Sequence, residues 1–410
     1  MTPIDAALTA VHHDVRLDEC AELLVRSTHM VVVTVDGDGS SDVRTTTHGT
    51  AEVRLFRGRA FGTASTELTD LAGLRTAIAD ARSASYEQPV EELPAVPSAT
   101  LMFRSADQEA PDVDALLQLA RQIAGRPGTR ATVGQTSRTV HRTVSTQGTV
   151  GFTSREVAAY GHDTGTAGVV AARIVMHPGE VNPAALHDEL DRARALRALP
   201  PGPAPEAVRR CVLTSAACAR LLSWVVPALS DLGRSGERVG EHVGSDVVTL
   251  VDDQSGDWPN GHAFDDFGFP GRRVVMVDKG RLRAPLSASG DPALTTSSAS
   301  RGQWTVAQPA MAYLQPAGKP PDTRAAEWLV DTVSVSTSMT GAGSSGAQLT
   351  LTGTRQCDGT PLARERRSMT CDVSDVLRRI VAVGADPVLV QRYRGLYGGT
   401  TVELDLTELL

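Results

Sequence analysis

The stretch GHAFDDFGFPGRRVVMVDKGRLR, residues 261–283, joins a cluster of polar side chains to a run of β-branched residues. Two acidic residues followed by Gly and Pro are typical of a turn, because Asp side chains bond to the nearby backbone and Gly accepts a positive φ. His262, Asp265 and Asp266 could equally bind a cation or transfer a proton. The spacing favours a turn between two strands and leaves a functional site as the alternative.

The residues on either side of this stretch predict a β-rich C-terminal half. The segments that read as strands are VVTLVDD, RRVVMVDKGRLR, EWLVDTVSVST, AQLTLTGTRQ and TTVELDLTELL. One helix is expected over 215–232, where the sequence is apolar nearly all round and should therefore be buried. Pro227 in its middle should kink or split it. A later helix is expected over 372–383, capped by Asp372.

The N-terminal half mixes helix and strand patterns. Helices are expected over 17–26, 69–83, 112–125 and 182–199. Antiparallel strands are expected over 41–66, where three or four short ones fit, over 129–174, and in a short piece over 100–104. In the last helix Asp188 and Arg192 have the spacing of an ion pair.

The segment LPPGPAPEAVRR, residues 199–210, interrupts this pattern, because its prolines suit neither a helix nor a central strand. The predicted fold class is therefore α+β. An N-terminal α/β domain with an antiparallel sheet is expected over 1–200, a Pro-rich linker over 201–210, and a β-rich domain containing one buried helix over 211–410.

Composition narrows the range of functions. The 410 residues carry a formal charge of −8 and only 4% aromatic residues, which argues against direct binding of nucleic acid. The five cysteines form no CxxC pair and are expected to be reduced thiols. The first residues lack a secretory pattern, and LLSWVVPAL is too short to span a membrane. We therefore expect a cytoplasmic protein.

Few polar residues stand out as site candidates. The histidines form no HExxH or HxH motif, so neither a metal site nor a cofactor is expected. His242 follows a Gly-rich loop that could line a cleft, whereas Ser223 has no base near it in sequence. The tract SMTGAGSSGAQ, residues 338–348, could bind an anion, but without the Lys and helix of a phosphate loop a solvent loop is favoured.

Several segments, taken in order, resemble the TldD/PmbA family, also called modulators of gyrase. They are GTAEVRLFRGRAFGTASTELTDLAGLRTAIADA at 49–81, AFDDFGFPGRR at 263–273 and QPAMAYLQPAG at 308–318. The resemblance covers most of the chain, and its most specific part is the DD-x-G-x-P element. It implies that Asp265 and Asp266 are turn acids near the cavity that paired subunits of this family enclose.

The resemblance also bears on metal binding. TldD-like members carry HExxxH on the first helix of the C-terminal domain and a later Cys, and are zinc peptidases, whereas PmbA (TldE)-like members lack these ligands. Here Ser223, Trp224 and Ala228 occupy the degenerate motif positions, and the late Cys-Gly-Lys stretch is missing. The resemblance therefore implies a PmbA/TldE-like chain with no metal of its own.

Three functions remain open at this stage. The first is a metal-free subunit of a peptidase or amide hydrolase, paired with a TldD-like zinc subunit or with itself. The Ala-, Arg- and Val-rich composition suits an actinobacterium, where a role in antibiotic biosynthesis is a variant. The second is a zinc-independent, deacetylase-like amidohydrolase that uses His242, His262, Asp265 and Asp266. The third is a non-catalytic scaffold.

Overall fold

The structure is a computed structural model. It describes residues 9, 13–58, 60–67, 71–84, 86–87, 111–144, 148–165, 170–202, 208–233, 239–254, 258–259, 261, 263–266, 268–287, 299–300, 306–336, 346–385, 387–392 and 395–407. Three of the sequence predictions, namely His262, the strand over 100–104 and most of the tract over 338–348, lie outside the described residues.

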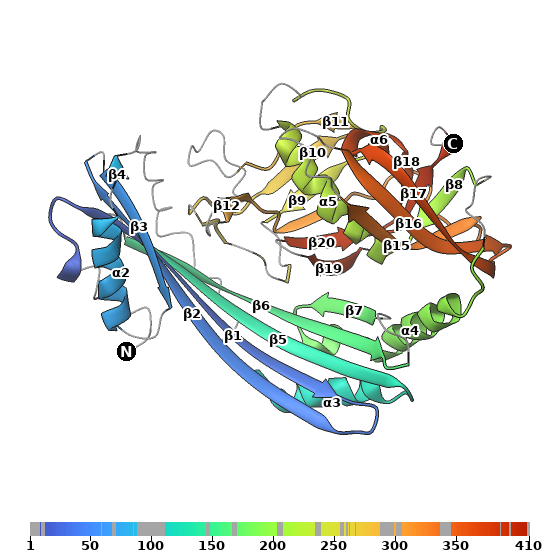
Figure 1. The fold of residues 1–410 in the computed structure, drawn as a ribbon, viewed down its shortest axis with the longest axis horizontal. Coiled ribbons are helices and arrows are strands. Elements are labelled where there is room, and N and C mark those ends of the chain that lie inside the picture. The colour runs from blue at the N-terminus through green and yellow to red at the C-terminus, as the bar shows by residue number, and fades with distance from the viewer. Residues whose placement is uncertain are drawn as a thin grey trace.

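A seven-stranded antiparallel sheet forms the N-terminal part, in the order β4-β3-β2-β1-β5-β6-β7. Its strands are β1 (Cys20–Val35), β2 (Ser41–Arg57), β3 (Ala60–Glu67), β4 (Tyr86–Glu87), β5 (Thr129–Val144), β6 (Gly148–Asp163) and β7 (Val170–Val175). Figure 1 shows β1, β2, β5 and β6 as long, curved strands that pass beneath the C-terminal body. The three or four short strands predicted over 41–66 are wrong in number, because this stretch forms the single 17-residue strand β2 and the strand β3. The alternating pattern continues through residues that resembled turns.

The predicted helix over 17–26 is wrong, because β1 begins at Cys20. Leu23 packs on one face of the sheet with α2 (Leu71–Ser83), and Leu24 packs on the other face with a turn of the C-terminal part. A strand covered on both faces is apolar at consecutive positions and loses its period of two. That loss made LDECAELLVR resemble an amphipathic helix.

Three further helical segments accompany the sheet: α3 (Val113–Ala124), the 3₁₀ turn η1 (Pro178–Glu180) and α4 (Pro183–Arg197). The helices α2 and α3 lie on the outer side of the curve in Figure 1. Asp112 caps α3 by accepting from the N–H of Ala115, and Asn182 caps α4. The predictions over 69–83, 112–125 and 182–199 are confirmed as helices.

Two six-stranded sheets build the C-terminal part, in the orders β11-β10-β9-β14-β20-β19 and β17-β16-β15-β8-β21-β18. The strands of the first are β9 (Leu250–Asp253), β10 (Arg273–Asp278), β11 (Arg281–Leu282), β14 (Met311–Leu314), β19 (Val388–Arg392) and β20 (Gly395–Gly399). Those of the second are β8 (Arg210–Leu213), β15 (Trp328–Ser336), β16 (Gly346–Cys357), β17 (Thr360–Asp372), β18 (Ile380–Val383) and β21 (Val402–Asp405). The remaining strands, β12 (Ala299–Ser300) and β13 (Val306–Ala307), pair with each other.

The helix α5 (Ser215–Gly233) packs against strands of both C-terminal sheets, β15 and β20. Their side chains form one apolar core that includes Trp328, Leu222 and Val225. Gly399 in β20 allows the closest approach, because a Cβ there would overlap the carbonyl oxygen of Ser215. The helix predicted over 215–232 is therefore confirmed.

The late helix is shorter than predicted, because α6 (Val373–Arg378) ends before the β-branched stretch that forms β18. Asp372 and Asp375 make a capping box at its start. The last residues of the predicted helix, Ile380–Val383, pair with β21, and tertiary pairing of this kind overrides a helical pattern of about three turns.

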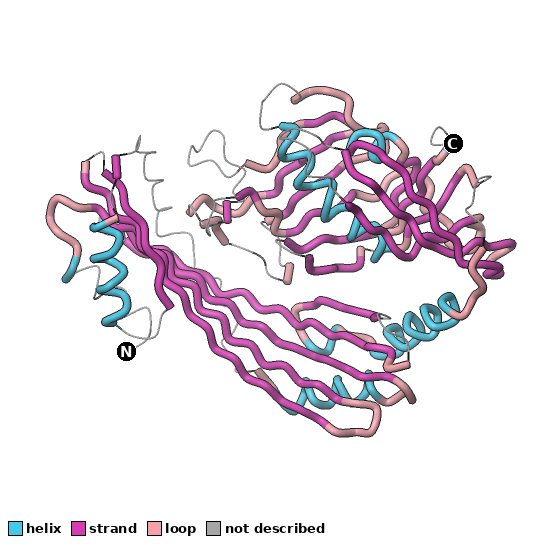
Figure 2. The backbone as a smooth tube through the Cα atoms, in the orientation of Figure 1, coloured by secondary structure: helices cyan, strands magenta, loops and turns pink. Residues whose placement is uncertain are grey.

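The α+β fold class is confirmed, and strands dominate both halves in Figure 2. The start of the Pro-rich segment, residues 200–202, pairs with the edge strand β17. The N–H of Gly202 donates to the carbonyl of Arg364, and the N–H of Arg364 donates to the carbonyl of Pro200. The division at 201–210 stays a prediction. Within the described part of the chain, no helix is both long and apolar enough to cross a membrane.

Candidate functional site

One stripe of α5 is open to solvent, although the sequence predicted a helix buried all round. Its partly or fully exposed positions are Ala216, Arg220, Ser223, Trp224, Pro227 and Ala228. They recur three or four residues apart and so share one helix face. The remaining described positions from Ala217 to Ser230 are buried in the core.

The three degenerate motif positions of the sequence analysis, Ser223, Trp224 and Ala228, all lie on this stripe. The hydroxyl of Ser223 donates to the carbonyl oxygen of Arg220 at 2.7 Å, as a serine inside a helix commonly does. Trp224 and Ala228 pack against the core. An indole and a methyl group offer no metal ligand, so this set does not fit a zinc ion. Among the residues that the structure describes, no group of three or more His, Cys, Asp or Glu side chains converges as a metal site would.

The stripe leads into a cleft between α4 and the C-terminal body, with a volume of about 470 Å³. The α4 wall contributes Ala185, Asp188, Glu189, Arg192, Ala193, Leu196 and Arg197. The opposite wall contributes Thr214, Ser215, Ala216 and Arg220 at the start of α5, with Leu329, Asp331, Thr332 and Arg364 from β15 and β17. This is the size of a small-molecule or short-peptide site.

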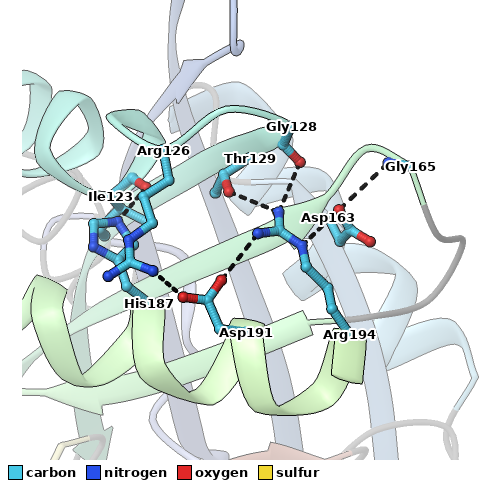
Figure 3. A network of polar contacts seen from close by, with 9 residues as sticks. All are labelled: Ile123, Arg126, Gly128, Thr129, Asp163, Gly165, His187, Asp191 and Arg194. Carbon is cyan, nitrogen blue, oxygen red and sulfur yellow. Dashed lines mark hydrogen bonds and ion pairs between the residues drawn. The ribbon is translucent and has the colours of Figure 1, made fainter. Parts of the chain in front are cut away.

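A polar network holds α4 in place on one side of this cleft (Figure 3). The Arg194 guanidinium donates to Asp163 and Asp191, and also to the carbonyl of Gly128 and the hydroxyl of Thr129, all at 3.0–3.2 Å. Because the fork bonds Asp163 at the end of β6 and the Gly128–Thr129 segment where β5 begins, it fixes the helix against the ends of these two strands.

Two further contacts complete this network. Arg126 forms an ion pair with Asp191, and His187 Nε2 lies 2.8 Å from the carbonyl oxygen of Ile123. His187 therefore orients α4 on α3. The remaining face of α4, with Asp188 and Arg192, borders the cleft.

The turn at 263–270 answers the question raised by the acidic pair. Asp265 is buried, and its carboxylate accepts from the N–H of Phe269 at 3.0 Å. Its backbone N–H donates to the carbonyl of Phe269, and its carbonyl accepts from Gly268, which has a φ of 87°. These are the bonds of a tight turn with the glycine at the left-handed position.

Asp266 ties this turn to the N-terminal sheet, where its carboxylate lies 2.5 Å from the guanidinium of Arg26. Beside it, Phe264 meets Phe152 of β6 edge to face, with ring centroids 5.0 Å apart. Both contacts join segments more than one hundred residues apart. The turn therefore docks the C-terminal part on the concave face of the long sheet.

A buried ion pair lies under the same turn. Arg142 of β5 and Glu22 of β1 are 2.6 Å apart, and both side chains are almost fully buried. Gly268 lies directly over the guanidinium of Arg142, where a Cβ would overlap it. Sequence reasoning missed this pair, because its partners are 120 residues apart and each reads as an ordinary polar residue of a strand.

His242 lies at another place, beside β11. Its Nε2 is 3.2 Å from a carboxylate oxygen of Asp246, and its backbone bridges to Arg281. Within the described residues, no hydrogen bond or ion pair joins His242 to Asp265 or Asp266. The structure thus brings Asp265 and Asp266 together in one turn and places His242 on a separate loop.

Asp252, in the middle of β9, is a buried carboxyl that the sequence analysis did not single out. Desolvation raises its pKa to about 6, against hydrogen bonds from Gln254 and the N–H groups of Met311 and Ala310. Burial also raises the pKa of the neighbouring Tyr397. An acid inside the apolar run VVTLVDD was the one signal that could have marked it.

Comparison with known proteins gives the family. The sequence model for the PmbA/TldA metallopeptidase C-terminal domain matches residues 210–402. The C-terminal part of the chain, residues 210–402, therefore carries a domain of the TldD/PmbA family. No curated protein matches the sequence.

Solved structures of low sequence identity share the fold of this chain. TldE from Thermococcus kodakarensis aligns with a TM-score of 0.76 at 15% identity, covering 98% of this chain and 99% of that one. A provisionally assigned gyrase modulator from Thermotoga maritima gives 0.69 at 14% identity, covering 98% of each chain. Another from Bacteroides thetaiotaomicron gives 0.72 at 15% identity, covering 98% and 97%.

Proposed function

We propose that this chain is a metal-free subunit of a TldD/PmbA-type peptidase or amide hydrolase, paired with a TldD-like zinc subunit. The observation that supports it is the open stripe of α5, where Ser223, Trp224 and Ala228 stand at positions that resemble the HExxxH motif. These side chains do not fit a metal, whereas the fold around them is kept. In this proposal the partner supplies the zinc-bound water that attacks the amide carbonyl.

The part played by this chain is to shape and close the cavity. The α5 stripe presents Trp224, a large apolar surface, and the cleft beside it presents arginines and hydroxyl groups. Such a wall orients a peptide and excludes water without transferring a proton. Specificity would then come from this chain and chemistry from its partner.

We place the pair in the cytoplasm. All five cysteines lie in the described part of the chain and none forms a disulfide. Burial raises the pKa of the Cys211 and Cys218 thiols to about 12, so neither is a ready nucleophile.

The test is to purify this chain alone and together with a TldD-like protein encoded beside its gene. Zinc content and hydrolysis of short peptides and acetylated amines are measured in both samples. We expect zinc and activity in the pair and neither in the single chain. Exchanging the partner's HExxxH histidines for alanine should abolish activity, whereas Ser223→Ala in this chain should leave zinc content unchanged.

Activity that survives strong chelation would contradict this proposal and favour a zinc-independent amidohydrolase. His242, His262, Asp265 and Asp266 would then be exchanged one at a time. Asp266 is held by Arg26 and Asp265 by its own turn, so loss of activity should be compared with loss of stability in each variant. If the complex of this chain with its TldD-like partner has no hydrolytic activity, a non-catalytic scaffold is the function that remains.

A further inference from the structure

The cleft beside α5 carries a surplus of positive charge in an acidic protein. Among its described lining residues are the five arginines Arg173, Arg192, Arg197, Arg220 and Arg364, against the three acids Asp188, Glu189 and Asp331. The whole chain has a net charge of −8. A local excess of arginine on such a background concentrates anions at this place.

Arg364 and Arg173 form ion pairs within the protein. Arg364 bonds both carboxylate oxygens of Asp331 at 2.9 and 3.0 Å, and Arg173 lies 2.8 Å from Glu189. These pairs neutralise two of the three acids. They stabilise the walls of the cleft and do not involve Arg192 or Arg220.

Arg192 and Arg220 stand on opposite walls and have no ion-pair partner among the described residues. The pair expected between Asp188 and Arg192 does not form within 4.0 Å, although their spacing allows it. Both guanidinium groups are accessible to solvent. Two forks that meet across a cleft can hold one planar oxyanion between them.

The rest of the lining is apolar or neutral. Apolar contacts come from Val170, Ala185, Ala193, Leu196, Leu329 and Val388. Thr214 and Ser215 add hydroxyl groups where α5 begins, and the positive end of that 19-residue helix adds to the field of Arg220. A ligand that fits both parts has an anionic end and a small apolar body.

We propose that this cleft binds the C-terminal carboxylate of a short apolar peptide, with Arg192 and Arg220 as the groups that recognise the anion. The arginines of the cleft indicate that the ligand is an anion. The choice of a peptide as that anion rests on the proposed function. Every peptide ends in this group, and hydrolysis of an amide bond creates a new one. A volume of about 470 Å³ accommodates two or three small residues.

The experiment is a calorimetric titration of the full chain, without partner or zinc, with N-acetyl-Ala-Val-Leu. We expect the free acid to bind and the C-terminal amide of the same peptide to bind at least tenfold more weakly, because the amide lacks the charge. Arg192→Ala and Arg220→Ala should each weaken binding of the acid about tenfold, and Arg220→Lys less so. Equal binding of acid and amide would overturn the proposal.

The control is Arg121→Ala, which removes an exposed arginine of α3 that does not line the cleft. This variant should bind the peptide as the unchanged chain does, and an equal loss of affinity in it would mean nonspecific attraction of anions.

A competition titration with inorganic phosphate distinguishes a site for a peptide carboxylate from a site for any anion. If phosphate displaces the peptide at the peptide's own concentration, the site takes anions in general and the peptide assignment fails. Because no hydrolysis is measured, a failure here is distinct from a failure of the proposed function.

Discussion

The docked turn and the α4–α5 cleft are both places where the two halves of the chain meet, and they use charge in opposite ways. In the turn, Asp266 is paired with Arg26, and below it Glu22 is paired with Arg142. In the cleft, Arg192 on α4 and Arg220 on α5 line the walls and have no ion pair among the described residues. The turn is packed by Phe264 and Phe152, whereas the cleft remains open.

The difference in charge pairing distinguishes the turn, which has a structural role, from the cleft, which is a candidate functional site. A buried charge must be paired, or its desolvation would unfold the region, so paired charges beneath a packed turn need no ligand to explain them. An exposed arginine costs little when unpaired and is available to a ligand. The acidic pair that looked most like a site therefore stabilises the fold, and one arginine from α4 and one from α5 border the candidate site.

Breaking the buried ion pair should give the largest effect. Glu22→Gln leaves the buried Arg142 guanidinium without its carboxylate, and we expect the free energy of unfolding to fall by about 3–5 kcal/mol. Urea unfolding followed by circular dichroism measures it. Replacing both partners, Glu22→Leu with Arg142→Met, should recover part of the loss. If the free energy of unfolding falls by less than about 1 kcal/mol in Glu22→Gln alone, the buried ion pair does not stabilise the contact beneath the turn.

The turn glycine gives the next largest effect. Gly268→Ala adds a Cβ that overlaps Arg142 and strains a φ of 87°, so we expect a loss of about 3 kcal/mol. The matched control is Gly39→Ala, with a φ of 86° and open space around it, which should cost only the backbone strain of about 1 kcal/mol. Equal losses in the two variants would show that the close approach to Arg142 contributes nothing.

Asp252 extends the comparison to a buried acid that has only neutral hydrogen-bond donors. Its folded pKa, about 6, lies above the unfolded value of 3.8, so its favourable contribution is complete below pH 3.8 and is lost as the pH rises through 6. Asp252→Asn removes this titration and keeps an oxygen for the N–H of Met311. Between pH 4 and pH 7 the unchanged chain should lose about 2 kcal/mol of unfolding free energy relative to the variant. Parallel pH profiles of the two proteins would contradict this.

Removing a cleft arginine should have the smallest effect on stability. Arg220→Ala exchanges an exposed side chain with no ion pair in the described part of the chain, and we expect a change within about 0.5 kcal/mol. Thermal unfolding checks it against Arg142→Ala, which should be strongly destabilised. A large loss for Arg220→Ala would mean that this arginine belongs to the fold, as those under the turn do.

Most helices and the strand-rich character of the chain could be predicted from the sequence, because caps and apolar periods are local signals. Asp112 before α3 and the capping box at Asp372 are examples. The errors fall where tertiary contacts cover a segment on both sides or extend a sheet. In β1, Leu23 and Leu24 are buried on opposite faces, and in β18 the pairing with β21 replaces a helix.

The candidate site was only partly predictable for the same reason. The sequence placed Ser223, Trp224 and Ala228 on one helix, and the structure put them on the stripe of α5 that stays open. The sequence could not show that Arg192 and Arg220 line the same cleft, because they come from different halves of the chain. Spacing in the sequence shows which residues are neighbours within one helix or strand. It gives no information on the distance between two such elements.

The sequence by itself determined the local elements, the acidic charge and the absence of metal ligands at the α5 motif positions, since these depend on residue type and short-range spacing. Only the tertiary structure decided that Asp266 meets Arg26, that Arg142 lies buried beneath Gly268, and that one face of α5 is open. These are contacts between segments far apart in the chain, and their energies depend on which charges are desolvated together.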